Sequence, residues 1–520
     1  MNIGLHLKRA AVYFPERTAV IDVGENTRLT YKELNERVNR LANALSDLGL
    51  KKGDRIASLS HNRYQLFLIL YACYKSGLIA VPLNARLSMA ELVHMMNNSE
   101  ASALILGPEY IEEIKKVQSD IKTVKHYICI SQTPLGMIDF DDIINKAPAD
   151  EPKIEVEIDD LCDLKFTSGT TGVLKAVMMT HRNKLCQARK GLLRDDGINQ
   201  DSVMCHTAPL THASSAMLLP IIMRGGKALI LPGFDIPALL NTIQREKVTN
   251  IFAVPTMLNM LMNYPDLKKY DISSLKTITY SSSPMPVEQI KQALKVFGPV
   301  LTQAYGLTEA SASVTLLTKK DHDITDGDPK KLKRLASAGR PESECEVRVV
   351  NEAGEDVQPG EVGEILERGD DTMVGYWKDP ELTATTLING WLHTKDMGYF
   401  DEDGYLYLVD RKGDMIISGG FNIYPSEVEG VIAGHPAVFE SAVIGVPDEI
   451  WGESVKALVV LKEGMTASED DIIELCKQHL SSYKKPKSVE FIKEIPKNPY
   501  GKVLKRKLRE NYWAGRERMI

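Results

Sequence analysis

The chain has 520 residues, of which 43% are hydrophobic and 26% are charged. This length exceeds what a single hydrophobic core organises, so at least two domains are expected. The formal net charge of −7 argues against general nucleic-acid binding, which requires a basic surface.

Three further features of the sequence bear on the class of protein. The longest apolar runs, Leu66–Cys73 and Ala216–Met223, are too short to cross a membrane and are expected to be buried core. Residues 1–20 contain no apolar segment of signal-peptide length. The seven cysteines are scattered without a CxxC pair, which is typical of reduced thiols and not of a disulfide framework or a zinc site. We therefore expect a cytoplasmic protein without an integral membrane segment.

The first part of the chain alternates between helices and short apolar strands. Thr30 and Glu33 form a capping box, which predicts a helix that begins there and ends near Gly49. A second helix is expected to run through Ile69. Strands are expected at 56–59, 79–83, 228–231, 251–254, 277–280 and 300–304. This rhythm predicts mostly parallel sheets covered by helices.

The pattern changes twice in the second part of the chain. From about Gly339, short strands at 347–351, 363–368 and 405–410 alternate with turns rich in glycine and aspartate, which predicts a small β-rich, barrel-like subdomain. After 410–414 the chain has an α+β pattern and ends in a basic stretch. The predicted fold is therefore α/β, with a large N-terminal domain at 1–411, a hinge at 412–414 and a small α+β C-terminal domain at 415–520.

The strongest local motif is Thr167-Ser-Gly-Thr-Thr-Gly-Val-Leu-Lys175. Small residues and glycines allow backbone N–H groups to turn toward an anion, the hydroxyl groups add donors, and Lys175 adds a positive charge. The motif does not match a Walker loop. Taken alone, its composition favours a solvated turn, so its role depends on the rest of the chain.

Four further motifs accompany this loop, in order along the chain. They are Gln303–Glu309, Gly390–Asp396, Tyr407–Gly420 together with Tyr424–Glu429, and Pro496–Lys502. The ordered set resembles the adenylate-forming superfamily, which includes acyl-CoA synthetases, firefly luciferase and the adenylation domains of nonribosomal peptide synthetases. The resemblance covers essentially the whole chain.

The resemblance implies a binding site for ATP. Tyr305 and Gly306 would contact adenine, opposite the small wall of Ser282, Ser283 and Pro284. Thr308 would bond the α-phosphate, and Glu309 would hold Mg²⁺. The alternatives are a core tyrosine and a carboxylate that caps a helix. The β- and γ-phosphates would lie against Thr167, Ser168, Gly169, Thr170, Thr171, Gly172 and Lys175.

The resemblance also implies roles for residues later in the chain. Asp396 would bind the ribose hydroxyls with Arg411 nearby, and Gly419 and Gly420 would leave room for the pantetheine arm of CoA. Lys502 would bridge the attacking carboxylate and the α-phosphate, two anions that repel each other. Without the resemblance, Asp396 reads as a turn residue and Lys502 as a surface lysine.

His212 and the hinge complete the implied machinery. His212 matches a position near the substrate carboxylate and the thiol entrance, where it would act as a gate; as a lone histidine it equally fits a satisfied core residue. Rotation of the C-terminal domain about Gly413 would separate the two half-reactions. The chain departs from the family pattern at Leu174, Ala176, Lys395 and Gly413, none of which removes a catalytic group.

The predicted function is that of an acyl-CoA synthetase in lipid or fatty acid metabolism that uses ATP, Mg²⁺ and coenzyme A. Small and apolar segments at 208–217, 252–258, 281–285 and 304–313 suit a hydrophobic monocarboxylate, either medium-chain fatty, aromatic or alicyclic. The chain stops after the Lys502 motif without a carrier domain. The alternatives are a ligase that loads a carrier-protein thiol, a non-catalytic nucleotide- or acyl-binding relative and, more remotely, a luciferase-like oxygenase. A homodimer is compatible with the sequence.

Overall fold

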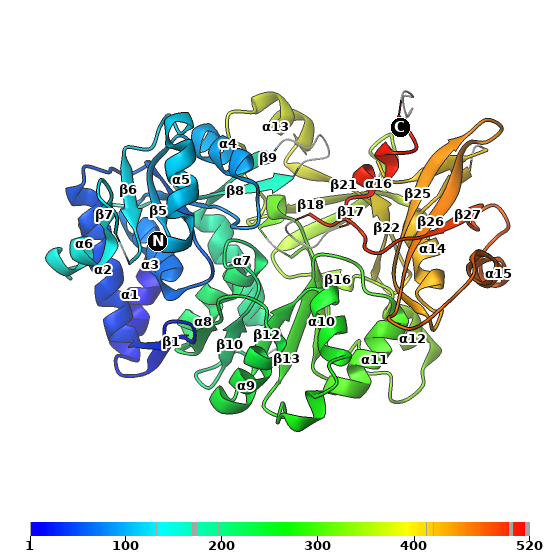
Figure 1. The fold of residues 1–520 in the computed structure, drawn as a ribbon, viewed down its shortest axis with the longest axis horizontal. Coiled ribbons are helices and arrows are strands. Elements are labelled where there is room, and N and C mark those ends of the chain that lie inside the picture. Colours follow the sequence, from blue (N-terminus) through cyan, green and yellow to red (C-terminus); the bar gives the residue numbers. More distant parts are fainter. Residues whose placement is uncertain are drawn as a thin grey trace.

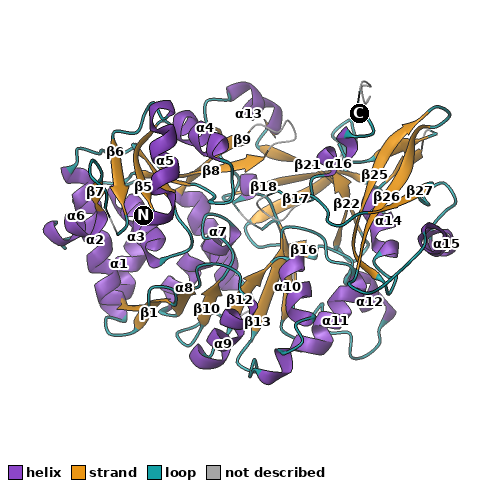
Figure 2. Ribbon diagram, in the orientation of Figure 1, coloured by secondary structure: helices purple, strands orange, loops and turns teal. Residues whose placement is uncertain are grey.

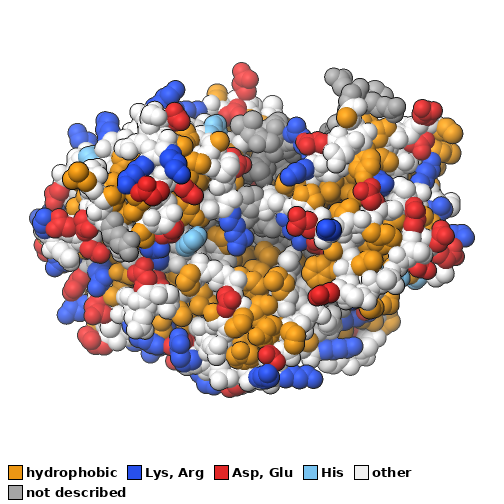
Figure 3. Space-filling view, in the orientation of Figure 1, with side chains coloured by type: hydrophobic (Ala, Val, Ile, Leu, Met, Phe, Trp, Pro, Cys, Tyr) orange, Lys and Arg blue, Asp and Glu red, His pale blue; other side chains and the backbone are white. Residues whose placement is uncertain are grey.

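The computed structural model describes residues 2–131, 133–168, 174–194, 197–311, 313–411, 413–419, 421–498 and 503–514. It is an α/β protein with a large N-terminal part and a smaller C-terminal part (Figures 1 and 2). Charged side chains of both signs are scattered over the face in Figure 3, while hydrophobic side chains gather over α10 (Pro255–Met262).

The first large sheet has nine strands in the order β16-β15-β14-β13-β12-β10-β11-β1-β2. Its five central pairings, from β14 through β1, are parallel, and antiparallel strands flank them on both sides. The prediction of a mostly parallel sheet is confirmed. The strands are β1 (Thr18–Asp22), β2 (Thr27–Thr30), β10 (Val203–His206), β11 (Lys227–Ile230), β12 (Asn250–Ala253), β13 (Thr277–Ser281), β14 (Leu301–Tyr305), β15 (Thr315–Leu317) and β16 (Arg340–Pro341).

The second large sheet has eight strands in the order β19-β9-β8-β4-β3-β5-β6-β7. It is parallel from β8 to β7, and β8, β9 and β19 pair antiparallel at the other end. The strands are β3 (Arg55–Leu59), β4 (Ile79–Pro82), β5 (Ala101–Leu106), β6 (His126–Cys129), β7 (Ile138–Asp139), β8 (Leu161–Ser168), β9 (Leu174–Thr180) and β19 (Gly375–Tyr376).

Helix α2 (Tyr31–Asp47) shows how the local sequence determines an element. The side chain of Thr30 accepts a hydrogen bond from the Glu33 backbone N–H, and the Glu33 carboxylate accepts one from the Thr30 N–H, so the predicted capping box is confirmed. Leu34, Val38, Leu41 and Leu45 form an apolar stripe along this helix and are fully buried, whereas Leu48, which continues the spacing, lies at the helix end and is only partly buried. Their spacing of three or four residues places them on one face, which forms the contact with the core.

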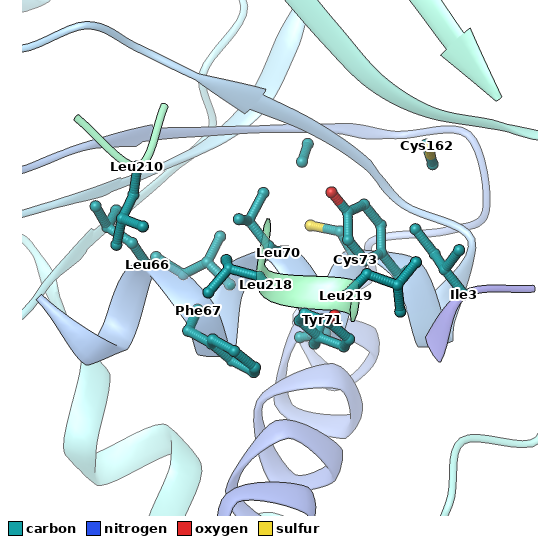
Figure 4. Close-up of a cluster of buried hydrophobic side chains, with 14 of the residues drawn as sticks. Ile3, Leu66, Phe67, Leu70, Tyr71, Cys73, Cys162, Leu210, Leu218 and Leu219 are labelled. Atoms are coloured by element: carbon teal, nitrogen blue, oxygen red, sulfur yellow. The ribbon is translucent and has the colours of Figure 1, made fainter. Parts of the chain in front are cut away.

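Helix α3 (Tyr64–Ser76) is buried on all sides, which confirms that the apolar run from Leu66 is core. Figure 4 shows Leu66 and Leu70 of this helix beside Leu218 and Leu219 of α8 (Leu218–Arg224). No helix of the described residues is both long and apolar enough to span a bilayer. The other helices of the N-terminal part are α1 (Gly4–Tyr13), α4 (Met89–Ser99), α5 (Ile111–Val117), α6 (Phe140–Lys146), α7 (His181–Leu193), α9 (Ile236–Glu246), α11 (Val287–Phe297), α12 (Pro329–Arg334) and α13 (Pro380–Thr386).

The predicted β-rich subdomain is a five-stranded antiparallel sheet. Its order is β17-β18-β21-β20, with β22 paired to the other end of the long strand β21. In Figure 1 these strands lie between the two large sheets and the C-terminal part. The strands are β17 (Cys345–Val350), β18 (Gly363–Gly369), β20 (Leu387–Ile388), β21 (Trp391–Phe400) and β22 (Leu406–Arg411).

The C-terminal part forms another five-stranded sheet, with the order β24-β23-β26-β25 and β27 paired to β26. Helices α14 (Pro425–Ile432) and α15 (Glu469–His479) contribute to a separate buried cluster with this sheet. The predicted hinge lies between the end of β22 and the start of β23. The remaining elements are β23 (Ile416–Ser418), β24 (Phe421–Ile423), β25 (Val438–Asp448), β26 (Gly452–Leu461), β27 (Ser488–Phe491) and α16 (Lys505–Glu510).

Candidate active site

The predicted phosphate loop joins the antiparallel strands β8 and β9. Thr167 on β8 pairs with Lys175 on β9, so the hairpin brings the first and last residues of the motif side by side. Gly169, Thr170, Thr171 and Gly172 lie outside the described residues, as does the side chain of Ser168. The ends of the loop are therefore held by a sheet, which is suited to placing backbone donors against an anion.

Glu309, the predicted metal ligand, is held by a residue that the sequence analysis missed. Tyr376 donates a hydrogen bond from Oη to Oε1 of Glu309 at 2.9 Å, and the Met373 N–H donates to the Glu309 carbonyl at 2.7 Å. Lys175 Nζ lies 5.9 Å from the centre of the Tyr376 ring. Tyr376 thus connects the predicted phosphate cation with the predicted metal ligand.

The position of Tyr376 follows from the short strand β19, which pairs with β9 next to the phosphate loop. Burial, together with the Glu309 carboxylate, raises the pKa of Tyr376 far above its usual value, so its hydroxyl remains a donor at neutral pH. The preceding Gly375 has φ +145°, and a Cβ there would lie 2.8 Å from Thr383 Cγ2. A glycine before an aromatic residue was the only local signal of this contact.

The chemistry of Glu309 fits a magnesium ion that is shared with the substrate. A carboxylate offers several acceptor sites, and the bond from Tyr376 uses one of them. The described residues contain no group of three or more His, Cys, Asp or Glu side chains able to hold a metal ion. Mg²⁺ takes six oxygen ligands, so phosphate and water oxygens would have to complete its shell.

The predicted adenine site forms where β13 and β14 end. These parallel neighbours place Ser281 opposite Ala304, so Ser282, Ser283 and Pro284 follow one strand while Tyr305 and Gly306 end the other. Ligands of open α/β sheets bind at the carboxyl ends of their strands. The structure thus brings the two predicted walls of the adenine site to the same edge of the sheet.

Asp396, the predicted ribose ligand, is connected to this edge. Tyr305 Oη donates a hydrogen bond to Asp396 Oδ2 at 2.8 Å, and Asp396 on β21 pairs with Arg411 on β22. The preceding Lys395 has φ +61°, a conformation that glycine adopts with less strain. This backbone conformation explains why the lysine is unusual at this position, and the Asp396 carboxylate still faces Tyr305.

His212 begins the 3₁₀ helix η3 (Ala213–Met217), where its Nδ1 lies 3.0 Å from Thr211 Oγ1. Burial and the positive charge of Lys165 lower the pKa of His212 to about 3, so the ring is neutral at physiological pH. Lys165 itself was missed by the sequence analysis. It lies on β8 two residues before Thr167, and its Nζ is 3.4 Å from Ser215 Oγ.

The predicted residues of the C-terminal part are only partly described. Gly419 lies in the turn between β23 and β24 with φ +58°, and its N–H donates to the Trp451 carbonyl at 2.8 Å. A Cβ at Gly419 would lie 2.4 Å from Trp451 Cε3. The ring of Trp451 thus explains the glycine. Gly420 and Lys502 lie outside the described residues.

Comparison with known proteins identifies the family. The model of the AMP-binding enzyme family matches residues 7–377, and the model of the AMP-binding enzyme C-terminal domain matches residues 427–502. The chain belongs to the AMP-binding enzyme family. It is therefore an enzyme of the adenylate-forming superfamily, as the ordered motifs predicted.

Members of this family with similar sequences match over nearly the whole chain. A feruloyl-CoA synthase of Amycolatopsis is 38% identical over 506 residues, which cover 97% of this chain and 98% of the relative. The long-chain-fatty-acid–CoA ligase FadD13 of Mycobacterium tuberculosis is 36% identical over 520 residues, with 99% of each chain covered. The two relatives differ in the kind of acid that their names give, so the family alone does not indicate the substrate.

Solved structures of the family share the fold. The crystal structure of the anthranilate CoA ligase AuaEII in complex with anthranoyl-AMP matches with a TM-score of 0.91 and 26% identity, covering 98% of this chain and 97% of that chain. A fatty acyl CoA synthetase of Mycobacterium tuberculosis matches with a TM-score of 0.78 and 34% identity over 99% of both chains. The predicted fold class is thereby confirmed.

Proposed function

We propose that the protein is an acyl-CoA synthetase. It joins a carboxylic acid to ATP, which gives an acyl-adenylate and pyrophosphate, and then transfers the acyl group to coenzyme A with release of AMP. The observation that carries this proposal is the meeting of Tyr305, Asp396, Glu309 and the β8–β9 hairpin through side-chain hydrogen bonds and strand pairings. The names of the relatives support CoA as the acceptor.

In the first half-reaction a carboxylate oxygen attacks the α-phosphorus, and pyrophosphate leaves. The carboxylate is ionised at neutral pH, so no general base is required. Tyr305 and Asp396 orient the nucleoside, while Thr167 and Lys175 hold the leaving phosphates. Glu309 would hold Mg²⁺, which neutralises phosphate charge when bound. Lys502 reduces the repulsion between the carboxylate and the α-phosphate.

In the second half-reaction the CoA thiol loses its proton to solvent, its sulfur attacks the acyl carbonyl carbon, and the bond to the phosphate oxygen breaks so that AMP leaves with the electron pair. His212 lies in the segment assigned to the thiol entrance. Its low pKa makes it a weak base and leaves it uncharged, so we assign it the role of a gate and not of a proton acceptor. The family resemblance assigns Gly419 and Gly420 to the path of the pantetheine arm, although the ring of Trp451 already occupies the place that a side chain at Gly419 would take.

The two half-reactions need different groups at one site, so we propose that residues 415–520 rotate about a hinge at 412–414. Lys502 lies in this C-terminal segment and would be present for adenylation and absent for thioester formation. Gly413 supports this role because glycine accepts a wide range of φ and ψ, and a Cβ built there meets no atom within 4 Å in the present conformation.

The acid is proposed to have a mostly hydrophobic body, either fatty, aromatic or alicyclic. The segment around His212 leads into a buried apolar cluster that contains Met217, Ile221 and Phe252. A carrier-protein thiol is the alternative acceptor, because an acyl-adenylate reacts with either thiol by the same chemistry.

The test is pyrophosphate release from ATP with a panel of carboxylic acids, followed with CoA, with a phosphopantetheinylated carrier protein and with neither. We expect pyrophosphate with at least one acid, and an acyl-CoA product only when CoA is added. A protein that releases no pyrophosphate with any acid of the three classes would refute the proposal, and acyl transfer to the carrier protein alone would favour the alternative.

A further inference from the structure

Strand β8 carries polar side chains at alternate positions. Asp163, Lys165 and Thr167 are two residues apart, so they lie on one face of the strand, whereas Leu164 and Phe166 on the other face are buried in the core. Thr167 at the end of this series belongs to the predicted phosphate loop. Lys165 is set back from it by one strand repeat, about 6.6 Å, and its ammonium group lies beside Ser215 of the segment 208–217 that we expect to line the acyl site.

The buried carboxylate nearest to Lys165 in sequence, Asp163, already has another cation as its partner. Asp163 is completely buried, and Lys184 of α7 lies 2.9 Å from its Oδ2 while Tyr74 Oη donates to its Oδ1 at 3.0 Å. These contacts form a neutral pair of Asp163 and Lys184. Lys165 is therefore a second cation at this place.

Lys165 has no carboxylate of its own among the residues that the structure describes. Its Nζ lies 3.4 Å from Ser215 Oγ, and a hydroxyl group cannot neutralise an ammonium ion. An interior cation without a compensating anion is costly. The protein retains one here, within the wall formed by β8 and η3.

This wall is mostly buried but reaches solvent in part. Lys165, His212, Ser215 and Ala216 are only partly buried although the residues around them in sequence belong to the core, and Ala213 is exposed. The positive charge of Lys165 acts on the His212 ring. The ammonium group therefore faces the same accessible space as the segment assigned to acyl binding.

We propose that Lys165 determines substrate specificity by binding a second oxygen-bearing group of the acid, either a carboxylate or a neutral hydroxyl or carbonyl group, close to the carboxyl group that is activated. This inference rests on the proposed acyl-CoA synthetase function and narrows its substrate class. The ammonium donates a charge-assisted hydrogen bond to that oxygen. Ser215 orients the ammonium, because its Oγ accepts from Lys165 while its own O–H donates to the His212 carbonyl at 2.7 Å. The rest of the acid stays apolar.

The selectivity depends on pH in a defined direction. Burial and the neighbouring Lys184 lower the pKa of Lys165 to about 7, against the opposing influence of Asp163 and Cys162 on its own strand. From η3 it is faced by the neutral His212. The ammonium is therefore present below about pH 7 and is lost above it, so the preference for a second carboxylate weakens as the pH rises through that value.

The experiment compares acids with the same carbon skeleton. The pairs are benzoate with the hydroxybenzoates and benzenedicarboxylates, and hexanoate with adipate and the oxohexanoates. We expect kcat/KM of the wild type to favour the oxygen-bearing member of at least one pair by roughly 10-fold or more, because a site built for a hydrogen bond discriminates strongly against analogues that lack the partner. Lys165→Met, similar in length but uncharged, brings this ratio close to one, chiefly through a lower kcat/KM for the oxygen-bearing member.

Two further variants resolve the chemistry of the second group. Lys165→Gln keeps a hydrogen-bond donor without the charge, so it retains the preference for a hydroxyl or carbonyl group and loses that for a second carboxylate. Ser215→Ala lowers the preference by less than Lys165→Met. Thermal unfolding shows whether each variant is folded. The kcat/KM ratio of the wild type between pH 6 and 9 tests the inference without any variant.

The outcomes separate this inference from the proposed function. Pyrophosphate release that is highest with the apolar member of every pair overturns the inference and leaves the acyl-CoA synthetase intact. If Lys165→Met lowers kcat/KM equally for all acids, the lysine acts on the reacting carboxylate, and the inference is again overturned. No pyrophosphate release by the wild type with any acid refutes the proposed function itself.

Discussion

The N-terminal and C-terminal parts of the molecule hold their predicted functional residues in different ways. In the N-terminal part, Tyr305 bonds to Asp396 and Glu309 bonds to Tyr376, so side chains far apart in the sequence are linked directly. The C-terminal part has its own buried cluster. Across the junction, Ser426 Oγ donates to the Val409 carbonyl and Arg509 pairs with Asp414 at 2.9 Å.

This difference matches the two demands of the reaction. Groups that hold the nucleotide throughout must keep their distances, and bonds between separate elements provide that rigidity. A cation needed in only one half-reaction is better carried by a unit that packs around its own core and is attached through a short segment. Each of the following predictions tests one side of this comparison.

The largest effect is expected for Lys502→Ala. Loss of the cation between two anions lowers the rate of adenylation by about 10³-fold or more. Thioester formation from supplied acyl-adenylate is expected to change little, because the proposed rotation would carry Lys502 away from the site. Pyrophosphate exchange and single-turnover acyl transfer measure the two steps. Lys507→Ala, an exposed lysine on α16, is the matched control, and equal loss of both steps in Lys502→Ala would contradict the rotation.

The rigidity of the N-terminal part is tested by Lys190→Met. Lys190 lies 2.5 Å from Asp371, and both side chains are only 1% exposed. The neighbouring Glu367 does not compete for the lysine, because burial and the Asp371 carboxylate raise the pKa of Glu367 to about 8 and keep it neutral. Removing the lysine leaves a buried carboxylate unpaired and lowers the free energy of unfolding by about 3–5 kcal/mol. Denaturant unfolding measures the loss.

An exposed pair serves as the control for that measurement. Lys146, whose side chain is 75% exposed, pairs with Asp142 at 2.6 Å. Lys146→Ala changes the free energy of unfolding by less than about 1 kcal/mol, since solvent screens the pair. Similar losses in Lys190→Met and Lys146→Ala would show that the buried pair does not stabilise the N-terminal part.

Gly413→Pro tests the attachment between the two parts. Proline fixes φ near −65° and prevents the backbone change that a rotation requires. We expect the rate of one half-reaction to fall by about 100-fold, because that step would be limited by the conformational change, while the rate of the other stays within a few-fold of the wild type. Gly413→Ala adds only a Cβ with no neighbour within 4 Å and is expected to retain both steps. Unchanged rates in Gly413→Pro would place the hinge elsewhere.

The smallest effect is expected for Tyr376→Phe, which removes a single hydrogen bond to Glu309. The bond is only partly buried, so we take the lower end of the range of about 1.5–3 kcal/mol that a bond to a charged group contributes, and the KM for Mg·ATP rises by roughly 10-fold. Direct titration of Mg²⁺ with the ATP complex should show the same loss of affinity. A lower kcat with unchanged Mg²⁺ affinity would mean that Tyr376 acts on Lys175 and not on Glu309.

Local features of the fold could be predicted from the sequence because neighbours along the chain determine them. The capping box at Thr30 needs only Glu33 three residues later, and the strands at 277–281 and 301–305 follow from apolar runs between turns. The ordered motifs were sufficient to indicate the family, because each is a short, continuous segment.

Long-range contacts could not be predicted in this way. Tyr376 meets Glu309 across 67 positions, and Lys165 meets Ser215 across 50. Neither contact has a local pattern, because both form only when sheets and helices pack. For Lys395, the sequence revealed an unusual residue, and only the positive φ explained why glycine is common there.

The sequence by itself determined the α/β class, the mostly parallel sheets and the membership of the adenylate-forming superfamily. The fold class and the family membership can be read from the sequence because they depend on the spacing of apolar residues and on short, continuous motifs. The tertiary structure decided which side chains meet, among them Lys165, which contacts Ser215 beside a buried pair that is already neutral. The physical reason is that the electrostatic environment of a group depends on which elements surround it, and packing brings those elements together from distant parts of the chain.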